Sequence, residues 1–256
     1  MIEITCNLCA KKESAVLFRK NGFNLVQCPF CKLAYINPQP DESELTDFYQ
    51  VHYKERDLRK RAGKIRDGTR RFGRIRKIAG GNGINILDVG CGVGYFLKAC
   101  QEKGWKACGV EPSARAAQYG RTEFNLDIRE GTLLSVDFPE KYFDVLTLYD
   151  VLEHVPDPAA NLKKAFKLLR PSGFLVVETI NFGHWKSKKQ GADWEQIVPP
   201  EHLFYFTPAT LKSLAEQSGF EYWGKFFQRP WKEGLKFIFR KPAGRPDGKI
   251  GASITG

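Results

Sequence analysis

The chain has 256 residues, a formal net charge of +11, 42% hydrophobic residues and 27% charged residues. This composition is typical of a soluble globular protein, and the length leaves room for one α/β domain of ordinary size plus a small additional unit. The N-terminus lacks a basic segment followed by an apolar core, and no apolar run approaches the roughly 20 residues of a membrane-spanning helix. We therefore expect a cytoplasmic protein with neither a signal peptide nor a transmembrane segment.

Two C-x-x-C pairs lie near the N-terminus, with eighteen residues between them. Their members are Cys6, Cys9, Cys28 and Cys31. Between the pairs, two apolar segments flank Asn21-Gly22, a favoured two-residue hairpin turn. Two cysteine turns brought together by a hairpin place four thiolates within tetrahedral reach, so the spacing predicts a structural zinc ion in a ribbon over residues 1–40. A redox-active C-x-x-C is the main alternative, but one pair would suffice for it and no βαβ pattern follows.

Residues 41–80 are interpreted as a basic helical connector that opens with a short helix at residues 41–49. From Lys54 to Lys77 the chain has twelve Lys or Arg residues and three acidic ones. Apolar residues recur every seven positions up to Phe72, which predicts an amphipathic helix with a solvated basic face. Three glycines, among them Gly68, weaken such a helix and can split it. The alternative is a surface for an anionic substrate, nucleic acid or a membrane.

An apolar segment from Ile84 to Val89 leads into a glycine-rich turn and then into a stretch with helical periodicity. The turn contains Gly90, Gly92 and Gly94. Glycines at a strand-to-helix turn let the backbone approach a ligand, with N–H groups of the helix start facing it. The dinucleotide fingerprint G-x-G-x-x-G is not matched, because Tyr95 occupies its sixth position. The turn therefore predicts a small-molecule cofactor site.

Two acidic residues accompany this turn. Asp88 stands at the end of the first strand, and Glu111 ends a second predicted strand about 20 residues beyond the turn, where a carboxylate can bind ribose hydroxyls. Together, Asp88-Val-Gly-Cys-Gly-Val-Gly94 and Gly109-Val-Glu-Pro-Ser113 resemble the first two motifs of class I S-adenosylmethionine (SAM) methyltransferases. The resemblance implies an α/β fold with a Rossmann-like seven-stranded sheet, preceded here by the small zinc ribbon.

From residue 83 onward, predicted strands and helices alternate, which indicates a parallel sheet. Further strands are predicted at residues 126–129, 143–149, 174–180, 220–223 and 235–239, and helices at residues 159–169 and 211–217. Asp157-Pro158 and Thr207-Pro208 signal the starts of these helices, and Pro171-Ser-Gly173 is predicted to end the first. We assign residues 81–242 to the methyltransferase domain and residues 243–256 to a flexible tail.

In the family that the sequence resembles, SAM lies beyond the carboxyl ends of the strands. The matching residues are Asp88, Gly90, Gly92, Gly94, Glu111, Thr132, Leu133 and Asp150. The resemblance implies contacts, in chain order, with the methionine part, the ribose, the adenine and the sulfonium side of SAM. Many relatives carry an acid where Thr132 stands, so backbone contacts from Thr132 and Leu133 are expected to serve the adenine instead.

Asp150-Val-Leu-Glu153-His154 resembles the motif after the fourth strand in small-molecule methyltransferases, including the ubiquinone-pathway O-methyltransferases. In those quinol enzymes a matching acid, Glu and His gather a divalent cation. A spacing of i, i+3 and i+4 would place three such ligands on one helical face. Local hydrogen bonding is the alternative, since Pro156 leaves barely one helical turn.

Residues 181–208, the lid segment, form a long connection rich in aromatic residues, as is common for substrate walls. Within it, Pro200-Glu-His-Leu-Phe-Tyr-Phe-Thr207 resembles the Glu-His-Leu-x-x-Phe segment of deoxysugar C-methyltransferases. There a Glu–His pair supplies the catalytic base, and an N-terminal zinc ribbon covers the site. The resemblance implies that His202, oriented by Glu201, is the catalytic base, although those enzymes have a further C-terminal domain. The alternative is a histidine that only bridges backbone groups of the segment.

The sequence therefore predicts a SAM-dependent methyltransferase whose acceptor is a small molecule, such as a sugar, a nucleotide sugar or another hydroxylated metabolite. A quinol O-methyltransferase is one alternative. An RNA methyltransferase that uses the ribbon and the basic helix is another, but the basic segment has few aromatic residues on which bases could stack. A non-catalytic zinc-containing binding module is a third. The sequence does not assign the methyl acceptor, the atom that is methylated or the oligomeric state.

Overall fold

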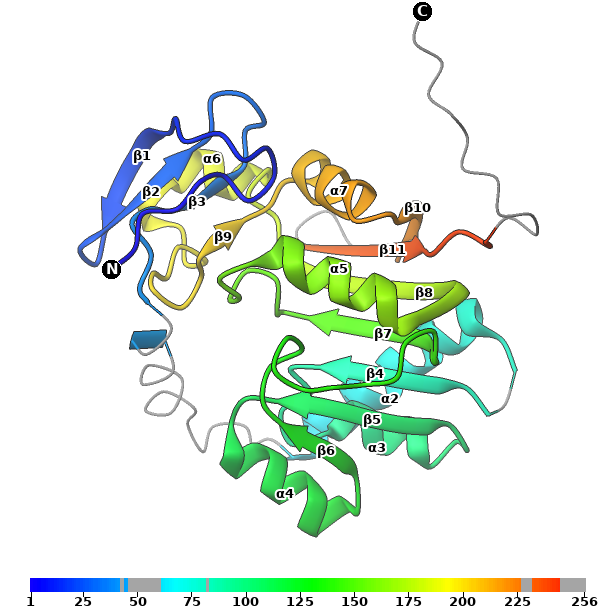
Figure 1. Cartoon of the computed structure of the whole chain (residues 1–256). Coiled ribbons are helices and arrows are strands. Elements are labelled where there is room, and N and C mark those ends of the chain that lie inside the picture. Colours follow the sequence, from blue (N-terminus) through cyan, green and yellow to red (C-terminus); the bar gives the residue numbers. More distant parts are fainter. Residues whose placement is uncertain (42–43, 46–60, 82, 227–231, 245–256) are drawn as a thin grey trace, which may run out of the picture.

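Seven strands form one mixed sheet in the order β10-β11-β8-β7-β4-β5-β6 (Figure 1). The computed structural model describes residues 1–41, 44–45, 61–81, 83–226 and 232–244. The strands are β4 (Asn85–Val89), β5 (Lys106–Glu111), β6 (Asp127–Glu130), β7 (Phe143–Tyr149), β8 (Leu169–Ile180), β10 (Glu221–Lys225) and β11 (Gly234–Arg240). The five strands from β8 to β6 are parallel, and β11 runs antiparallel to both β8 and β10. The predicted Rossmann-like seven-stranded sheet is confirmed.

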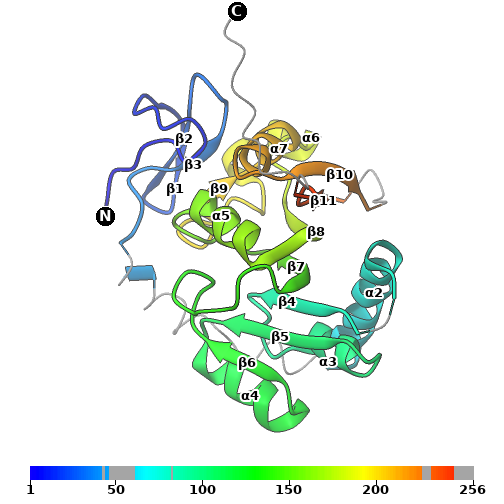
Figure 2. The same ribbon diagram turned by 45° about the vertical axis from the view of Figure 1, so that its right-hand side comes forward.

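Apolar side chains cover both faces of this sheet, as a parallel sheet requires. The helices are α2 (Arg61–Ala79), α3 (Tyr95–Gln101), α4 (Ala114–Phe124), α5 (Pro158–Leu168) and α7 (Pro208–Gln217). Along β4, Ile86 packs with α2 and α3, whereas its neighbour Leu87 packs with α5 and α7 on the opposite face. Figure 2 shows α2 on one side of the sheet and α5 on the other. The predicted short helix at 41–49 and the predicted tail lie largely outside the described residues.

The two predicted helix starts are confirmed by their hydrogen bonds. The Asp157 carboxylate accepts from the Ala160 N–H at 2.8 Å, and Pro158 occupies the first turn of α5. At α7, Thr207 and Thr210 exchange side-chain and backbone hydrogen bonds in a capping box. The predicted end of the first helix is less accurate, because β8 begins at Leu169, directly after α5. This earlier start is explained by the pairing of Leu169 with Phe143 on β7.

Helix α2 is continuous from Arg61 to Ala79. The three glycines that were expected to weaken this helix do not split it. Gly68 shows why one glycine is needed. A Cβ atom there would lie 2.6 Å from the Tyr95 carbonyl oxygen, so only glycine lets α2 approach the start of α3 this closely. Farther along, Phe72 and Ile75 are buried against the sheet, and Phe72 meets Trp105 with ring centroids 4.9 Å apart. Helix α2 is therefore packed into the sheet domain along its apolar side.

The N-terminal strands form a second sheet of order β1-β2-β3-β9. Its members are β1 (Ala15–Lys20), β2 (Phe23–Gln27), β3 (Ala34–Ile36) and β9 (Phe204–Tyr205). The predicted hairpin turn is confirmed, because Asn21 and Gly22 both have positive φ, at 51° and 84°. The fourth strand, β9, comes from the lid segment, which also contains α6 (Trp185–Gln190) and a 3₁₀ turn (Gly191–Asp193). The ribbon and the lid segment are thus joined through one hydrogen-bonded sheet.

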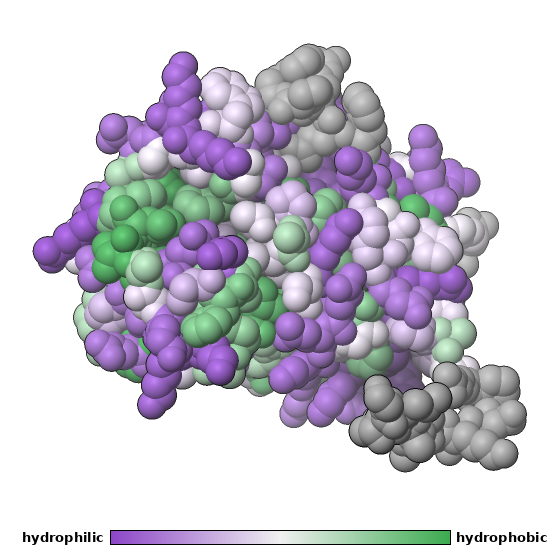
Figure 3. Space-filling model, turned by 90° about the horizontal axis from the view of Figure 1, so that it is seen from above, coloured by the Kyte–Doolittle hydropathy of each residue, from purple (hydrophilic) through white to green (hydrophobic). Residues whose placement is uncertain are grey.

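The ribbon exposes several apolar side chains. Viewed from above, hydrophobic areas gather on the left side of the molecule, where Figure 1 places the ribbon strands (Figure 3). Val16 and Phe30 of this part are 62% and 59% exposed. A sheet this small cannot bury all of its apolar residues by itself.

None of the helices in the described part of the chain has both the length and the apolar character needed to cross a membrane.

Candidate functional site

The glycine-rich turn connects β4 to α3 at the carboxyl edge of the sheet, where the strand order reverses. Gly90, Gly92 and Gly94 all have left-handed φ values, of 65°, 55° and 85°. A Cβ atom at Gly90 would lie 2.8 Å from the side chain of Val151, and one at Gly94 would lie 2.4 Å from that of Leu126. The turn therefore needs glycine for both its backbone conformation and its close packing.

Asp88 lies beneath this turn and is 4% exposed. Its carboxylate accepts a hydrogen bond of 2.6 Å from the hydroxyl of Thr147, which stands opposite on β7. Burial raises the pKa of Asp88 to about 7, although the Thr147 hydrogen bond and the nearby Arg71 charge act in the opposite direction. The strand edge thus holds a carboxyl group that changes its charge near neutral pH.

Glu111 ends β5 and is also buried. Its carboxylate accepts from the Gly92 N–H at 2.8 Å and from the Ser113 N–H at 2.9 Å. One acidic side chain therefore ties the glycine turn to the start of α4, where Ser113 is the N-cap residue. Carboxylate oxygens have more than one acceptor site each, so one carboxylate can hold backbone N–H groups and ligand hydroxyls together.

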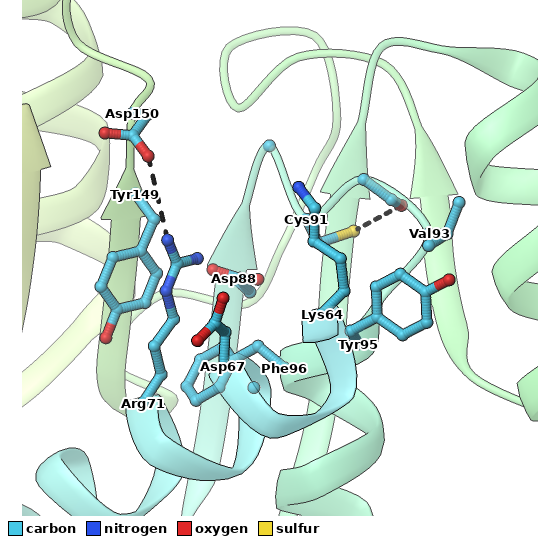
Figure 4. A pocket seen from close by; sticks show the side chains of 13 residues that line it. Lys64, Asp67, Arg71, Asp88, Cys91, Val93, Tyr95, Phe96, Tyr149 and Asp150 are labelled. Carbon is cyan, nitrogen blue, oxygen red and sulfur yellow. Dashed lines mark hydrogen bonds and ion pairs between the residues drawn. The ribbon is translucent and has the colours of Figure 1, made fainter. Parts of the chain in front are cut away.

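A cavity of about 230 Å³ opens between α2, the glycine turn and the end of β7 (Figure 4). Its lining residues are Lys64, Asp67, Gly68, Arg71, Asp88, Gly90, Cys91, Gly92, Val93, Tyr95, Phe96, Tyr149 and Asp150. Figure 4 shows Arg71 rising from α2 alongside Tyr149 toward Asp150. The guanidinium carbon lies 4.1 Å from the Tyr149 ring centroid, and one guanidinium nitrogen lies 3.8 Å from the Asp150 carboxylate. The cavity therefore brings both positive and negative side chains to the glycine turn.

Four predicted cofactor residues line this cavity, namely Asp88, Gly90, Gly92 and Asp150. The predicted adenine residues lie elsewhere, because Thr132 and Leu133 follow β6. The main-chain N–H of Thr132 donates to the hydroxyl of Ser135 at 2.9 Å, so this amide is engaged within its own turn. Leu133 is buried. The predicted cofactor residues therefore do not all lie in one cavity. Some of them line the cavity at the glycine turn, whereas Thr132 and Leu133 lie at the end of the outer strand β6.

Sequence reasoning missed the three charged cavity residues on α2, which are Lys64, Asp67 and Arg71. They belong to the segment that was interpreted as a solvated basic connector. Phe72 and Ile75 fix the buried side of the helix, and Gly68 sets its contact with α3. Gly68 could have indicated this contact from the sequence, because a glycine inside a helix often marks the close approach of two backbones.

A second polar cluster lies between the turn after β7 and the lid segment. It consists of Glu153, His154 and His202, whose potential ligand atoms all lie within 4.8 Å of one another. The two imidazole rings meet edge to face with centroids 4.8 Å apart. Glu153 is 1% exposed and accepts from the Thr179 hydroxyl at 2.8 Å. The backbone brings the cluster together, because the Glu153 carbonyl accepts from the Leu203 N–H at 2.6 Å.

Main-chain carbonyls orient both histidines of this cluster. His202 Nδ1 lies 2.9 Å from the Gln196 carbonyl oxygen, and His154 Nδ1 lies 2.7 Å from that of Glu201. The Glu201 side chain is exposed, and Glu201 contributes through its main-chain carbonyl. The acceptor for Nδ1 of His202 is therefore the Gln196 carbonyl and not the Glu201 carboxylate that was expected to orient this ring. Burial and, secondarily, the neighbouring His154 lower the pKa of His202 to about 3, which keeps its ring neutral.

The four cysteines of the ribbon form a third cluster. Cys6 and Cys31 approach with sulfurs 3.3 Å apart, and Cys9 and Cys28 with sulfurs 3.4 Å apart. The two C-x-x-C turns repeat one hydrogen-bond pattern, since the carbonyls of Cys6 and Cys28 each accept from the N–H four residues later. Four thiols gathered from two such turns fit a tetrahedral zinc site.

Comparison with known proteins identifies the fold and the family. A family model described as a methyltransferase domain matches residues 57–224. The chain belongs to this methyltransferase family. The predicted enzyme class, a SAM-dependent methyltransferase, is thereby confirmed.

Two curated relatives are ubiquinone biosynthesis O-methyltransferases. The methyltransferase is 29% identical over 184 residues to the protein of Bradyrhizobium diazoefficiens, covering 63% of this chain and 72% of that relative. It is 31% identical over 161 residues to the protein of Bradyrhizobium sp. strain ORS 278, covering 55% of this chain and 63% of that one. The chain thus spans between about three fifths and three quarters of these relatives.

Solved structures share the fold at low identity. Magnesium protoporphyrin IX methyltransferase from Synechocystis PCC 6803, with bound SAH, gives a TM-score of 0.61 at 15% identity, covering 78% of this chain and 100% of that one. The 1,6-didemethyltoxoflavin-N1-methyltransferase of Burkholderia thailandensis gives a TM-score of 0.59 at 17% identity, covering 90% of this chain and 99% of that one. These likenesses establish the common architecture of the methyltransferase.

Proposed function

We propose that this methyltransferase binds SAM with the methionine end of the cofactor in the cavity between α2 and the glycine turn. The observation that carries the proposal is the pairing of charges in that cavity. The amino-acid end of SAM has one ammonium and one carboxylate group. Lys64 and Arg71 can receive the carboxylate, whereas Asp67 and Asp88 can receive the ammonium.

The size of the cavity supports this orientation. Its volume of about 230 Å³ is below the roughly 300–1,000 Å³ of pockets that enclose a drug-sized ligand. It therefore suits one end of SAM, and the rest of the cofactor would lie along the carboxyl edge of the sheet. In that direction stands Glu111, which we propose for the ribose, followed by the turn at Thr132 and Leu133, which we propose for the adenine.

The acceptor would approach from the side of the cluster of Glu153, His154 and His202, between the turn after β7 and the lid segment. Methyl transfer from a sulfonium is an in-line displacement, so the protein must mainly position the acceptor atom. His202 presents its Nε2 lone pair within this cluster, since the Gln196 carbonyl requires the proton on Nδ1. We propose that this lone pair accepts the proton that the acceptor hydroxyl loses as its oxygen takes the methyl group, and that Glu201 contributes by holding His154 through its carbonyl.

We further propose a small molecule with a hydroxyl group as the acceptor. The curated relatives named as ubiquinone biosynthesis O-methyltransferases support a phenolic hydroxyl. The Glu201-His202 sequence of the lid segment, which resembles that of the deoxysugar C-methyltransferases, supports a sugar or nucleotide sugar. Both classes supply a hydroxyl that must lose its proton, which is the step that needs a lone-pair donor nearby.

The ribbon has a structural part in this proposal. Zinc held by its four cysteines would stabilise residues 1–40, and the pairing of β3 with β9 would transmit that order to the lid segment. We propose the division into ribbon, connector, methyltransferase domain and tail given above, with one change. Helix α2 of the connector is part of the cofactor site.

Transfer of a labelled methyl group from SAM tests this proposal. The full chain is incubated with labelled SAM and, separately, with a catechol-type quinol, a nucleotide sugar and total RNA. We expect label in the quinol or the nucleotide sugar, and a turnover reduced roughly 10²–10⁴-fold in His202→Ala, the range typical of proton-transfer assistance. Label found only in RNA would overturn the small-molecule acceptor.

A further inference from the structure

We propose that Glu233 is a positioning residue for methyl transfer, in that its carboxylate fixes the turn of the lid segment that orients His202. Glu233 directly precedes β11, and α7 and β10 separate it from the lid segment along the chain. The part of His202 in methyl transfer rests on the proposed function, whereas the contacts of Glu233 do not.

The Glu233 carboxylate binds two parts of the lid segment. One of its oxygens accepts from the indole N–H of Trp194 at 2.7 Å, and the other accepts from the ammonium group of Lys186 on α6. The main-chain carbonyl of Glu233 accepts from the Asn181 N–H at 2.7 Å, directly after the end of β8. Glu233 therefore holds the lid segment at its beginning, in α6 and at Trp194.

Burial makes the hydrogen bond between Glu233 and Trp194 a specific one. Trp194 is fully buried, and the Glu233 side chain is 14% exposed. A buried indole N–H needs an acceptor, which the Glu233 carboxylate provides. Burial acts to raise the pKa of Glu233, but the hydrogen bonds from Lys186 and Trp194 outweigh it and lower this pKa. The acceptor is therefore ionised at neutral pH, and hydrogen bonds to an ionised acceptor are the stronger ones.

Trp194 begins the turn that orients His202. The Trp194 carbonyl accepts from the Ile197 N–H at 2.9 Å, which closes a turn that contains Gln196. The Gln196 carbonyl oxygen lies 2.9 Å from Nδ1 of His202. A carbonyl oxygen only accepts, so this bond requires the proton on Nδ1 and leaves the lone pair on Nε2. A displacement of the turn would therefore release both the orientation and the tautomer of the His202 ring.

The ribbon contacts the same turn by apolar packing. Trp194 and Ile197 belong to a buried cluster with Leu25 and Ile36 of the ribbon sheet. Apolar packing is not directional, whereas a hydrogen bond weakens steeply when its angle changes. The bond to Glu233 thus gives the Trp194 ring a directional constraint that packing against the ribbon does not supply.

Four variants of the full chain test this inference. Glu233→Ala removes the acceptor for the indole N–H, whereas Glu233→Gln retains an amide oxygen in its place. Trp194→Phe retains a buried aromatic ring and removes the N–H. Glu195→Ala is the matched control, because it removes the same type of side chain from an exposed position of the same turn.

Turnover is measured with labelled SAM and with the catechol-type quinol or the nucleotide sugar, whichever accepts the label. We expect kcat to fall roughly 10- to 100-fold in Glu233→Ala and Trp194→Phe, the loss caused by a misplacement of up to about 1 Å near the reacting atoms. The double variant should lose no more than either single variant, because both remove the same bond. Glu233→Gln and Glu195→Ala should stay close to the wild-type kcat, and SAM affinity should be unchanged in all variants.

A second measurement needs no acceptor. In ¹⁵N NMR of the histidine-labelled chain, His202→Ala identifies the signal of His202. We expect the proton on Nδ1 in the wild type, Glu233→Gln and Glu195→Ala, and a mixture of both tautomers in Glu233→Ala and Trp194→Phe. A residue that only stabilises the fold would leave this tautomer unchanged.

The inference is wrong if Glu233→Ala and Trp194→Phe keep the Nδ1 tautomer and the wild-type kcat while His202→Ala loses turnover. It is also wrong if Glu233→Gln and Glu233→Ala lose turnover equally with the tautomer unchanged. Circular dichroism checks folding, and Trp194→Phe decides the question if Glu233→Ala does not fold. Full turnover in His202→Ala rejects the role of His202 in the proposed function, and the tautomer measurement then still decides whether Glu233 orients its ring.

Discussion

The hydroxyl of Thr147 on β7 donates a 2.6 Å hydrogen bond to the buried carboxylate of Asp88 on β4. The two residues stand opposite each other in neighbouring parallel strands, directly below the glycine turn. This bond fixes the Asp88 carboxylate at the floor of the cavity. The charge of the cavity near neutral pH therefore depends on Asp88, whose pKa is raised to about 7, together with Asp150, whose pKa burial raises to about 6.

This relationship predicts that SAM affinity rises with pH. Asp88 attracts the ammonium group of SAM only when its carboxylate is ionised. The affinity for SAM should therefore increase between about pH 6 and pH 8 and level off above pH 8. Asp88→Asn should bind SAM more weakly and remove most of this dependence. Asp137→Asn, at a fully exposed carboxylate, serves as the control and should retain it. Calorimetric titrations at several pH values provide the measurement, and an equally steep dependence in Asp88→Asn would contradict the assignment.

A second prediction compares two glycines of α2. Gly73→Ala should stabilise the protein by up to about 1 kcal/mol, because alanine favours helix and nothing lies within 4 Å of the new Cβ atom. Gly68→Ala should destabilise it by about 1–3 kcal/mol and weaken SAM binding, because its Cβ atom would lie 2.6 Å from the Tyr95 carbonyl oxygen. Urea unfolding and SAM titration of both variants measure these effects. Equal stabilities would show that α2 and α3 are not in close contact.

Arg71 provides a third prediction. Its guanidinium stacks on Tyr149 and faces the cavity, so Arg71→Met should retain the stacking volume and lose the positive charge. We expect SAM affinity to fall about 10- to 100-fold, which corresponds to one hydrogen bond to a charged group. Arg76→Met, at an exposed position of the same helix, is the matched control and should bind SAM normally. If both variants bind as the wild type does, the methionine end of SAM lies elsewhere.

A fourth prediction concerns the ribbon. Removal by a chelator of the zinc that we propose for the ribbon, or Cys28→Ser, should lower the methyl-transfer rate much more than SAM affinity. The reason is that β3 pairs with β9 of the lid segment, whereas the cavity lies at the glycine turn. Trp194 is fully buried in the cluster that joins the ribbon to the lid segment. Its fluorescence should change when the contact between the ribbon and the lid segment is weakened. Cys108→Ser, outside the cysteine cluster, should keep both zinc and activity. An unchanged rate after zinc removal would separate the ribbon from catalysis.

Short-range patterns predicted much of this fold. The apolar runs of β4 and β7, the Asn21-Gly22 hairpin and the helix starts at Asp157 and Thr207 all depend on neighbouring residues. Each of them is present in the structure. The predicted cysteine cluster also forms, because a hairpin between two C-x-x-C turns leaves few other arrangements.

Contacts between residues far apart in the chain could not be predicted from the sequence in the same way. Strands β3 and β9 have three and two residues, too few for a pattern, and their pairing joins parts of the chain far apart in sequence. The meeting of His154 with His202 depends on the path of the lid segment, which the Leu203 N–H bond to the Glu153 carbonyl fixes. Arg71 was assigned to a solvated face because helical periodicity does not reveal what stands beside the buried side.

Calorimetric titration of the full chain with SAM, in the wild type and in Gly92→Asp, tests whether the cofactor binds at the glycine turn. We expect one SAM molecule per chain with a micromolar Kd for the wild type. We expect no detectable binding for Gly92→Asp, because a side chain in the turn would occupy the space that the cofactor needs. Absence of binding to the wild type, or unchanged affinity in Gly92→Asp, would contradict the placement of SAM at this turn.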